Sequence, residues 1–211
     1  DLCTEAQLVD RANSVASGGL VKLVSDLLTD AVGLFSKKAM QTGYWFKQNA
    51  PHINFVCPKI SPYAKEACIA LERLICESCD SISVVGSSMG GFLGTHLIEK
   101  YCIKGALVNP AVNPALGLSE YLGDNRSYLT NDDWVFTRSH IDEYQEITYQ
   151  SIKQHQNYLI LLETGDEILN YKHAVQFYDK ASIIIEEGGD HRFVSYSKHL
   201  PTIYNFLFSN T

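Results

Sequence analysis

The sequence predicts an α/β fold, with a mostly parallel sheet that helices cover on both faces. From the middle of the chain onward, short apolar runs alternate with amphipathic stretches. The runs are rich in Ile, Val and Leu and lack the every-second-residue alternation of a strand with one wet face, so we expect strands that are buried on both faces. Five runs are candidate strands: Ile53–Cys57, Ser81–Val85, Gly105–Asn109, Tyr158–Glu163 and Ser182–Glu186.

The amphipathic stretches between these runs are expected to form helices. Each connection of the form strand, helix, strand is expected to cross right-handed, which places helices on both faces of a parallel sheet. A chain of 211 residues with 45% hydrophobic residues suits one compact core, so we expect a single domain over residues 1–211. The expected helices are Tyr63–Glu77, Gly91–Tyr101, Tyr171–Lys180 and Lys198–Phe208.

Two regions interrupt the alternation. Residues 110–156 contain no recognisable strand, and their helical stretches Leu118–Leu122 and Trp134–Ile147 predict a small helical cap over an apolar pocket. Residues 1–35 predict an atypical helical N-terminal segment, because apolar residues recur there at the spacing of one helix face. This stripe consists of Leu20, Leu23, Val24, Leu27, Leu28, Ala31 and Val32.

The composition excludes two classes of function. The chain has 17 Lys and Arg against 24 Asp and Glu, a formal net charge of −7, and so lacks the positive surface that a nucleic-acid-binding protein needs. No apolar run approaches the roughly 18 residues of a membrane-spanning helix. We therefore expect neither a nucleic-acid partner nor a membrane partner.

The cysteines point to the cellular compartment. Six of them are unevenly spaced in a chain that is long enough to fold without disulfides. We expect reduced thiols and a cytoplasmic protein, with the pair Cys76 and Cys79 structural or incidental. A zinc site is disfavoured because no second pair of ligands lies near these two residues, and no metal or organic cofactor is expected.

The sharpest chemical signal is the segment Gly86-Ser87-Ser88-Met89-Gly90, which lies between a buried strand and a helix. This G-x-S-x-G pattern is typical of a nucleophile elbow, where glycines let a sharp turn pass close to its neighbours. We expect Ser88 to be a nucleophile. The backbone N–H of Met89, at the start of the helix, is an expected donor to the oxyanion that forms when a serine attacks a carbonyl.

A serine hydroxyl needs a histidine as general base and a carboxylate that orients the histidine. Asp166 and His191 follow the last two candidate strands, and the carboxyl ends of parallel strands share one edge of a sheet. We therefore expect a triad of Ser88, Asp166 and His191. Glu167 is next in line as the acid, whereas Asp190 is adjacent to the histidine in sequence and is poorly placed to orient it.

Together these motifs resemble the YqiA-type esterases, a family of small bacterial α/β-hydrolases, over about residues 36–208. The resemblance implies a cytoplasmic serine esterase that acts on short acyl esters, small-molecule substrates, through Ser88, Asp166 and His191. The segments that carry the resemblance are Val85–Gly91, Val108–Val112, Tyr121–Gly123, Ser139–Ile141, Thr164–Glu167 and Ile185–His191.

The chain departs from that family at its start. Members of the family open with a strand and a His-Gly-Phe turn that supplies the second oxyanion amide, and nothing in residues 1–35 matches this. Loss of such an amide typically costs about 10²–10³ in turnover. The alternative is therefore a non-catalytic α/β-hydrolase-like binding or interaction protein with an impaired oxyanion hole. A backbone amide between Val32 and Lys38 near the oxyanion would favour the enzyme over this alternative. A third interpretation is that the protein forms an oligomer through the apolar stripe of its N-terminal segment.

Overall fold

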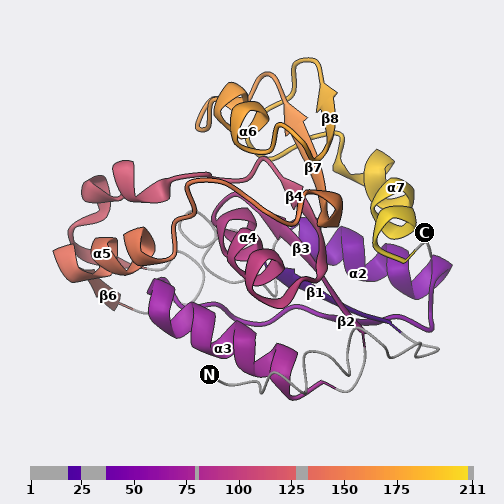
Figure 1. The fold of residues 1–211 in the computed structure, drawn as a ribbon, viewed down its shortest axis with the longest axis horizontal. Coiled ribbons are helices and arrows are strands. Elements are labelled where there is room, and N and C mark those ends of the chain that lie inside the picture. The colour runs from indigo at the N-terminus through magenta and orange to yellow at the C-terminus, as the bar shows by residue number, and fades with distance from the viewer. Residues whose placement is uncertain (1–18, 25–36, 79–80, 127–132, 209–211) are drawn as a thin grey trace.

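The protein is built on a parallel sheet of six strands in the order β2-β1-β3-β4-β7-β8. The computed structural model describes residues 19–24, 37–78, 81–126 and 133–208, with the backbone alone for 19–24. Each pair of neighbouring strands in this sheet is parallel, which confirms the expected α/β class (Figure 1). The strands are β1 (Gly19–Val24), β2 (Asn54–Val56), β3 (Ser81–Ser87), β4 (Lys104–Val108), β7 (Tyr158–Glu163) and β8 (Ser182–Glu186).

Helices cover both faces of the sheet, and the central strands bury residues on both. In β3, Val84 belongs to the apolar cluster on one face and Val85 to the cluster on the other. The same alternation holds for Ile160 and Leu161 in β7, as expected for strands with no wet face. One cluster includes residues of α3 (Ala64–Cys76), α4 (Met89–Tyr101) and α6 (Tyr171–Phe177), and the other includes residues of α2 (Lys37–Asn49) and α7 (Tyr196–Phe208).

The N-terminal segment corrects one expectation. Gly19–Val24 is not helical but forms β1, which lies between β2 and β3 in the sheet. A short apolar run such as Leu20–Val24 satisfies both the helical spacing and a buried strand, and only the two neighbouring strands decide between them. The rest of the predicted helical segment, residues 1–18 and 25–35, lies outside the described residues. The strand that the resemblance left unmatched is therefore present.

The cap corrects a second expectation. The stretch Trp134–Ile147 was expected to be one helix, but its first three residues belong to β6 (Asp133–Phe136), which pairs antiparallel with β5 (Gly123–Arg126). Thr137 then caps α5 (Arg138–Glu146), since its extended backbone and its reciprocal hydrogen bonds with His140 start the helix there. The predicted helix at 118–122 is a 3₁₀ turn, Leu118–Tyr121. The cap is thus mixed rather than helical.

The cysteines correct a third expectation. Cys68 and Cys102 are free thiols, but Cys76 is disulfide-bonded, so the prediction of reduced thiols is wrong at this residue. Uneven spacing does not reveal a pairing, because a disulfide depends on how close two Cβ atoms come in the fold. One observation that favoured a cytoplasmic protein is thereby lost.

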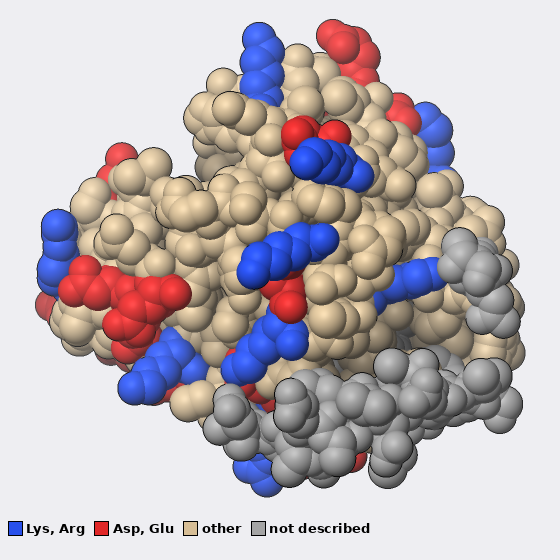
Figure 2. All heavy atoms as spheres, in the orientation of Figure 1, with Lys and Arg blue, Asp and Glu red and all other residues tan. Residues whose placement is uncertain are grey.

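Charged residues of both signs are mixed on one face of the molecule (Figure 2). Figure 2 shows Lys and Arg interspersed with Asp and Glu on the face it presents, rather than gathered into one patch. Among the helices of the described residues, none is long and apolar enough to cross a membrane.

A charged cluster centred on the buried residue Glu72 joins α3 to α4. Glu72 Oε1 lies 2.8 Å from Lys100 Nζ and 2.9 Å from His96 Nε2. Burial raises the pKa of the Glu72 carboxyl, but its hydrogen bonds and charge interactions with Lys100 and His96 outweigh burial, so its pKa is lowered. Burial lowers the pKa of His96 more than Glu72 raises it.

This cluster predicts a loss of stability in acid. A carboxyl with a lowered pKa stabilises the fold above its unfolded pKa of about 4.5, and this contribution is lost as the pH falls through the folded pKa. A histidine with a lowered pKa acts in the same direction below about pH 6.5, because the unfolded chain then binds more protons. Between about pH 7 and about pH 5 the Glu72 carboxyl stays charged, so only His96 of this cluster titrates. Urea unfolding over this range should therefore give a flatter dependence of the unfolding free energy on pH for His96→Gln than for the parent.

The control is Glu77→Gln at the end of α3, the helix that carries Glu72. Glu77 pairs only with Arg73 one turn away, and both side chains are exposed, so its removal should leave the pH dependence unchanged. Parallel curves for His96→Gln and the parent would contradict the role of this cluster.

Candidate active site

Ser88 lies on a sharp turn between β3 and α4. Its backbone has φ 52° and ψ −118°, a conformation that a residue other than glycine adopts at a cost of about 1–3 kcal/mol. The surrounding backbone holds the turn: the Ser88 N–H donates to the Val108 carbonyl (3.1 Å), and the Ser88 carbonyl accepts from Gly91 (2.9 Å) and Ala111 (3.1 Å). The side chain is 7% exposed. The turn is thus fastened both to its own helix and to the end of β4.

Gly86 lets the turn close. A Cβ at this position would meet the backbone carbonyl of Gly90 at a distance that real Cβ atoms do not show. Gly86→Ala is therefore expected to destabilise the protein by about 1–3 kcal/mol, because backbone rather than a flexible side chain must move. Gly117→Ala is the control, since the only atom near its added Cβ is 3.9 Å away. Equal midpoints of urea unfolding for the two variants would contradict this account.

The three residues of the expected triad come together at the carboxyl edge of the sheet. His191 Nε2 lies 3.0 Å from Ser88 Oγ, and His191 Nδ1 lies 3.0 and 2.9 Å from Asp166 Oδ1 and Oδ2. Ser88 follows β3, Asp166 follows β7 and His191 follows β8. The imidazole, in a residue only 6% exposed, thus bridges the hydroxyl and the carboxylate.

The two candidate acids have separate contacts. Asp166 Oδ1 also accepts hydrogen bonds from the backbone N–H groups of Ile168 (2.9 Å) and Leu169 (2.7 Å), which hold the carboxylate toward the imidazole. Glu167 Oε2 instead accepts from the backbone N–H of His191, at 2.9 Å. The geometry therefore favours Asp166 as the orienting acid and gives Glu167 a contact with the backbone of the histidine.

Met89 is the first residue of α4. The first N–H groups of a helix have no partner within the helix and lie at the positive end of its dipole, so this amide suits an oxyanion donor. A second oxyanion donor was sought among the backbone amides from Val32 to Lys38. Most of these residues belong to the segment 25–36, which lies outside the described residues. Within the described part, β1 ends with Val24 opposite Gly86, so the chain leaves β1 two residues before the level of Ser88.

Two buried polar residues beside the triad escaped the sequence analysis. Asn109 follows β4 with φ 41°, and its Nδ2 donates to the carbonyls of Asp190 (3.2 Å) and His191 (3.3 Å). Glu163, the last residue of β7, is 1% exposed. Burial raises the pKa of this carboxyl, but hydrogen bonds from Ser195, Asp190 and Val194 outweigh burial and lower its pKa. The sequence did hold one signal for both residues, since each is a polar residue at the end of a predicted apolar strand.

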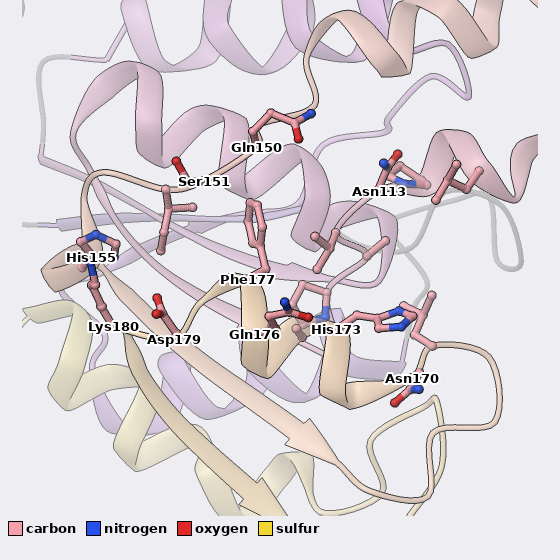
Figure 3. Close-up of a pocket in the computed structure, with 18 residues that line it drawn as sticks. Asn113, Gln150, Ser151, His155, Asn170, His173, Gln176, Phe177, Asp179 and Lys180 are labelled. Atoms are coloured by element: carbon pink, nitrogen blue, oxygen red, sulfur yellow. The ribbon is translucent and has the colours of Figure 1, made fainter.

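A cavity of about 660 Å³ adjoins the site. Its walls come from residues 110–116, 150–155 and 169–180, so the connection expected to cover a pocket contributes part of it. Polar side chains line it as well as apolar ones, with His173, Gln176 and Phe177 of α6 facing it in Figure 3. Two of the lining residues also contact the triad: the Ala111 N–H donates to the Ser88 carbonyl, and the Leu169 N–H donates to Asp166 Oδ1.

Comparison with known proteins gives the family. The model of an uncharacterised protein family, UPF0227, matches residues 35–208. The chain belongs to UPF0227. This is the family of the YqiA-type proteins that the motifs resemble. The UPF0227 match begins after β1, in agreement with the departure at the start of the chain.

Solved structures show that this UPF0227 member has the α/β-hydrolase fold. A putative hydrolase from Agrobacterium vitis S4 is 14% identical over 90% of this chain and 88% of that chain, with a TM-score of 0.73. Mouse alpha/beta hydrolase domain-containing protein 10 is 15% identical over 90% and 89%, with a TM-score of 0.68. Est1E from Butyrivibrio proteoclasticus is 12% identical over 93% and 89%, with a TM-score of 0.66.

Proposed function

We propose that this protein is a serine esterase that hydrolyses short-chain carboxylic esters. The observation that carries the proposal is the continuous chain of short contacts from Ser88 Oγ through the His191 imidazole to the Asp166 carboxylate. This arrangement suits a hydroxyl that must lose its proton as it attacks. The strained backbone at Ser88, at the start of α4, further supports a nucleophile elbow.

In the first half of the reaction, Ser88 Oγ attacks the ester carbonyl carbon while His191 Nε2 accepts the hydroxyl proton. Asp166 holds the imidazole through Nδ1 and stabilises the positive charge that it gains. The Met89 N–H donates to the oxyanion of the tetrahedral intermediate. His191 then returns the proton to the alcohol oxygen as the C–O bond breaks, and the acyl group remains on Ser88.

In the second half, a water molecule attacks the acyl carbonyl and His191 accepts its proton. The bond to Ser88 Oγ breaks, the proton returns to that oxygen, and the carboxylic acid leaves. The preference for a short acyl group and for an ester rather than an amide rests on the resemblance to the YqiA-type esterases. A small-molecule ester is accordingly the proposed substrate.

The experiment that tests the proposal is covalent labelling by a fluorophosphonate probe, which modifies activated serines. We expect the parent protein to be labelled on Ser88, as located by mass spectrometry of peptides, and a variant lacking the imidazole, His191→Ala, to be unlabelled. A folded parent that is neither labelled nor able to hydrolyse p-nitrophenyl acetate would contradict the proposal and favour the non-catalytic alternative.

A further inference from the structure

The carboxylate of Glu163 holds the loop that carries His191. Glu163 Oε1 accepts from the backbone N–H of Ser195 (2.9 Å) and from its hydroxyl (2.7 Å). Glu163 Oε2 accepts from the backbone N–H groups of Asp190 and Val194, both at 3.0 Å. One buried side chain therefore fastens the residues on both sides of the histidine to the end of β7.

Asn109 fastens the same loop from β4. Its Nδ2 donates to the carbonyls of Asp190 and His191, while its Oδ1 accepts the backbone N–H of Glu163 at 3.0 Å. The two side chains thus form one network that joins the ends of β4 and β7 to the histidine loop. None of these contacts involves the imidazole itself, so the network acts on the base only through the position of its backbone.

The loop needs such a hold because its backbone is not in a relaxed conformation. Phe193 has φ 58° and Gly189 has φ 76°, and a positive φ at a bulky residue such as phenylalanine persists only when the surroundings impose it. Gly189 packs directly against Glu163, since a Cβ at Gly189 would occupy the place of the carboxylate. The Glu163 carboxylate therefore packs against the backbone of the turn at Gly189, where no side chain larger than hydrogen fits.

We propose that Glu163 is a positioning residue for the general base, with Asn109 as its second anchor. This inference rests on the proposed esterase function and deepens it by identifying what sets the distance between His191 Nε2 and Ser88 Oγ. The partners of the carboxylate are all donors, and a carboxylate is an acceptor at both oxygens. An amide in its place would direct an NH₂ group at one pair of donors, leaving buried groups unsatisfied and displacing the loop.

The test compares Glu163→Gln with Glu186→Gln. Glu186 lies in register with Glu163 on the neighbouring strand β8, but its carboxylate binds Lys198 of α7. In Glu163→Gln we expect kcat for p-nitrophenyl acetate to fall about 10- to 100-fold with KM little changed, since small misplacements of a reacting group cost about this much. Glu186→Gln should retain the parent kcat.

A second measurement follows the histidine directly. The Nδ1–H of His191 bound to Asp166 should give a downfield proton resonance, assigned by its loss in His191→Ala. We expect this resonance to shift or broaden in Glu163→Gln and to persist in Glu186→Gln. A merely structural role would lower the free energy of unfolding and leave kcat per folded molecule and this resonance unchanged.

The outcomes separate the inference from the proposed function. A folded Glu163→Gln with parental kcat and resonance overturns the inference alone, if Ser88→Ala is inactive. If the parent has no esterase activity, the proposed function fails, and the resonance still decides whether Glu163 positions His191. If Glu163→Gln does not fold, Ser195→Ala removes a single donor from the network, and we expect kcat to fall about threefold or more; a parental kcat and an unchanged resonance would overturn the inference.

Discussion

Replacing Ser88 by alanine is expected to lower kcat for p-nitrophenyl acetate by about 10⁴- to 10⁶-fold, the range typical of loss of a serine nucleophile. The Ser88 hydroxyl is the group that forms the acyl-enzyme. Without it, the site can still bind the substrate and donate to the oxyanion, but it has no nucleophile. The fold should be little affected, because the change removes one oxygen and leaves the backbone hydrogen bonds that hold the turn in place. Steady-state kinetics together with a urea unfolding curve measure both effects.

The adjacent serine provides the control. Ser87 Oγ is buried and has no hydrogen-bond partner among the described residues. Ser87→Ala therefore loses no hydrogen bond to any part of the chain that the structure describes. It should keep both activity and stability, although it changes the same residue type one position earlier in the chain. Residual activity above about 1% in Ser88→Ala would contradict the role of this nucleophile, since the effect expected is at least a hundred times larger.

Replacing Asp166 by asparagine is expected to lower kcat by about 10⁴-fold with little change in size or shape. An amide at this position can donate to His191 Nδ1 and so favours the tautomer whose Nε2 carries the proton. That imidazole cannot accept a proton from Ser88. The positive charge that develops on the ring also loses its counterion.

Glu167→Gln distinguishes the two candidate acids. Glu167 accepts the backbone N–H of His191 and its own backbone N–H. A glutamine side chain still has a carbonyl oxygen that can accept the bond from His191. We expect a loss below about tenfold. The reverse order, with a severe loss in Glu167→Gln and a mild one in Asp166→Asn, would make Glu167 the orienting acid.

The position of β1 bears on the non-catalytic alternative. That alternative rested on a missing strand and a missing amide, and the strand is present between β2 and β3. β1 runs parallel to β3 and ends with Val24 opposite Gly86, two residues before Ser88. The case for an impaired oxyanion hole therefore now depends on the amide alone.

Local pattern was enough to identify much of the fold and the candidate site. β7 and β8 begin and end at the predicted residues. Every residue of β7 is buried, as expected for an apolar run in a sheet that helices cover on both faces, whereas the edge strand β8 has no fully buried residue. Ser88, Asp166 and His191 were identified from turns that follow strands, since parallel strands bring their carboxyl ends to one edge whatever the details of packing.

Tertiary structure decided the features that depend on contacts between residues far apart in sequence. Gly19–Val24 became a strand because two neighbouring strands offered unpaired backbone on either side, and Asp133–Phe136 because Gly123–Arg126 pairs with it. The network of Glu163 and Asn109 likewise has no local pattern, since each residue is satisfied by a loop 27 to 82 positions away. The sequence by itself determined which residues can perform the chemistry. Only the fold decided which buried polar groups hold them in place, because the cost of burying a polar group depends on the donors and acceptors that the folded chain brings to it.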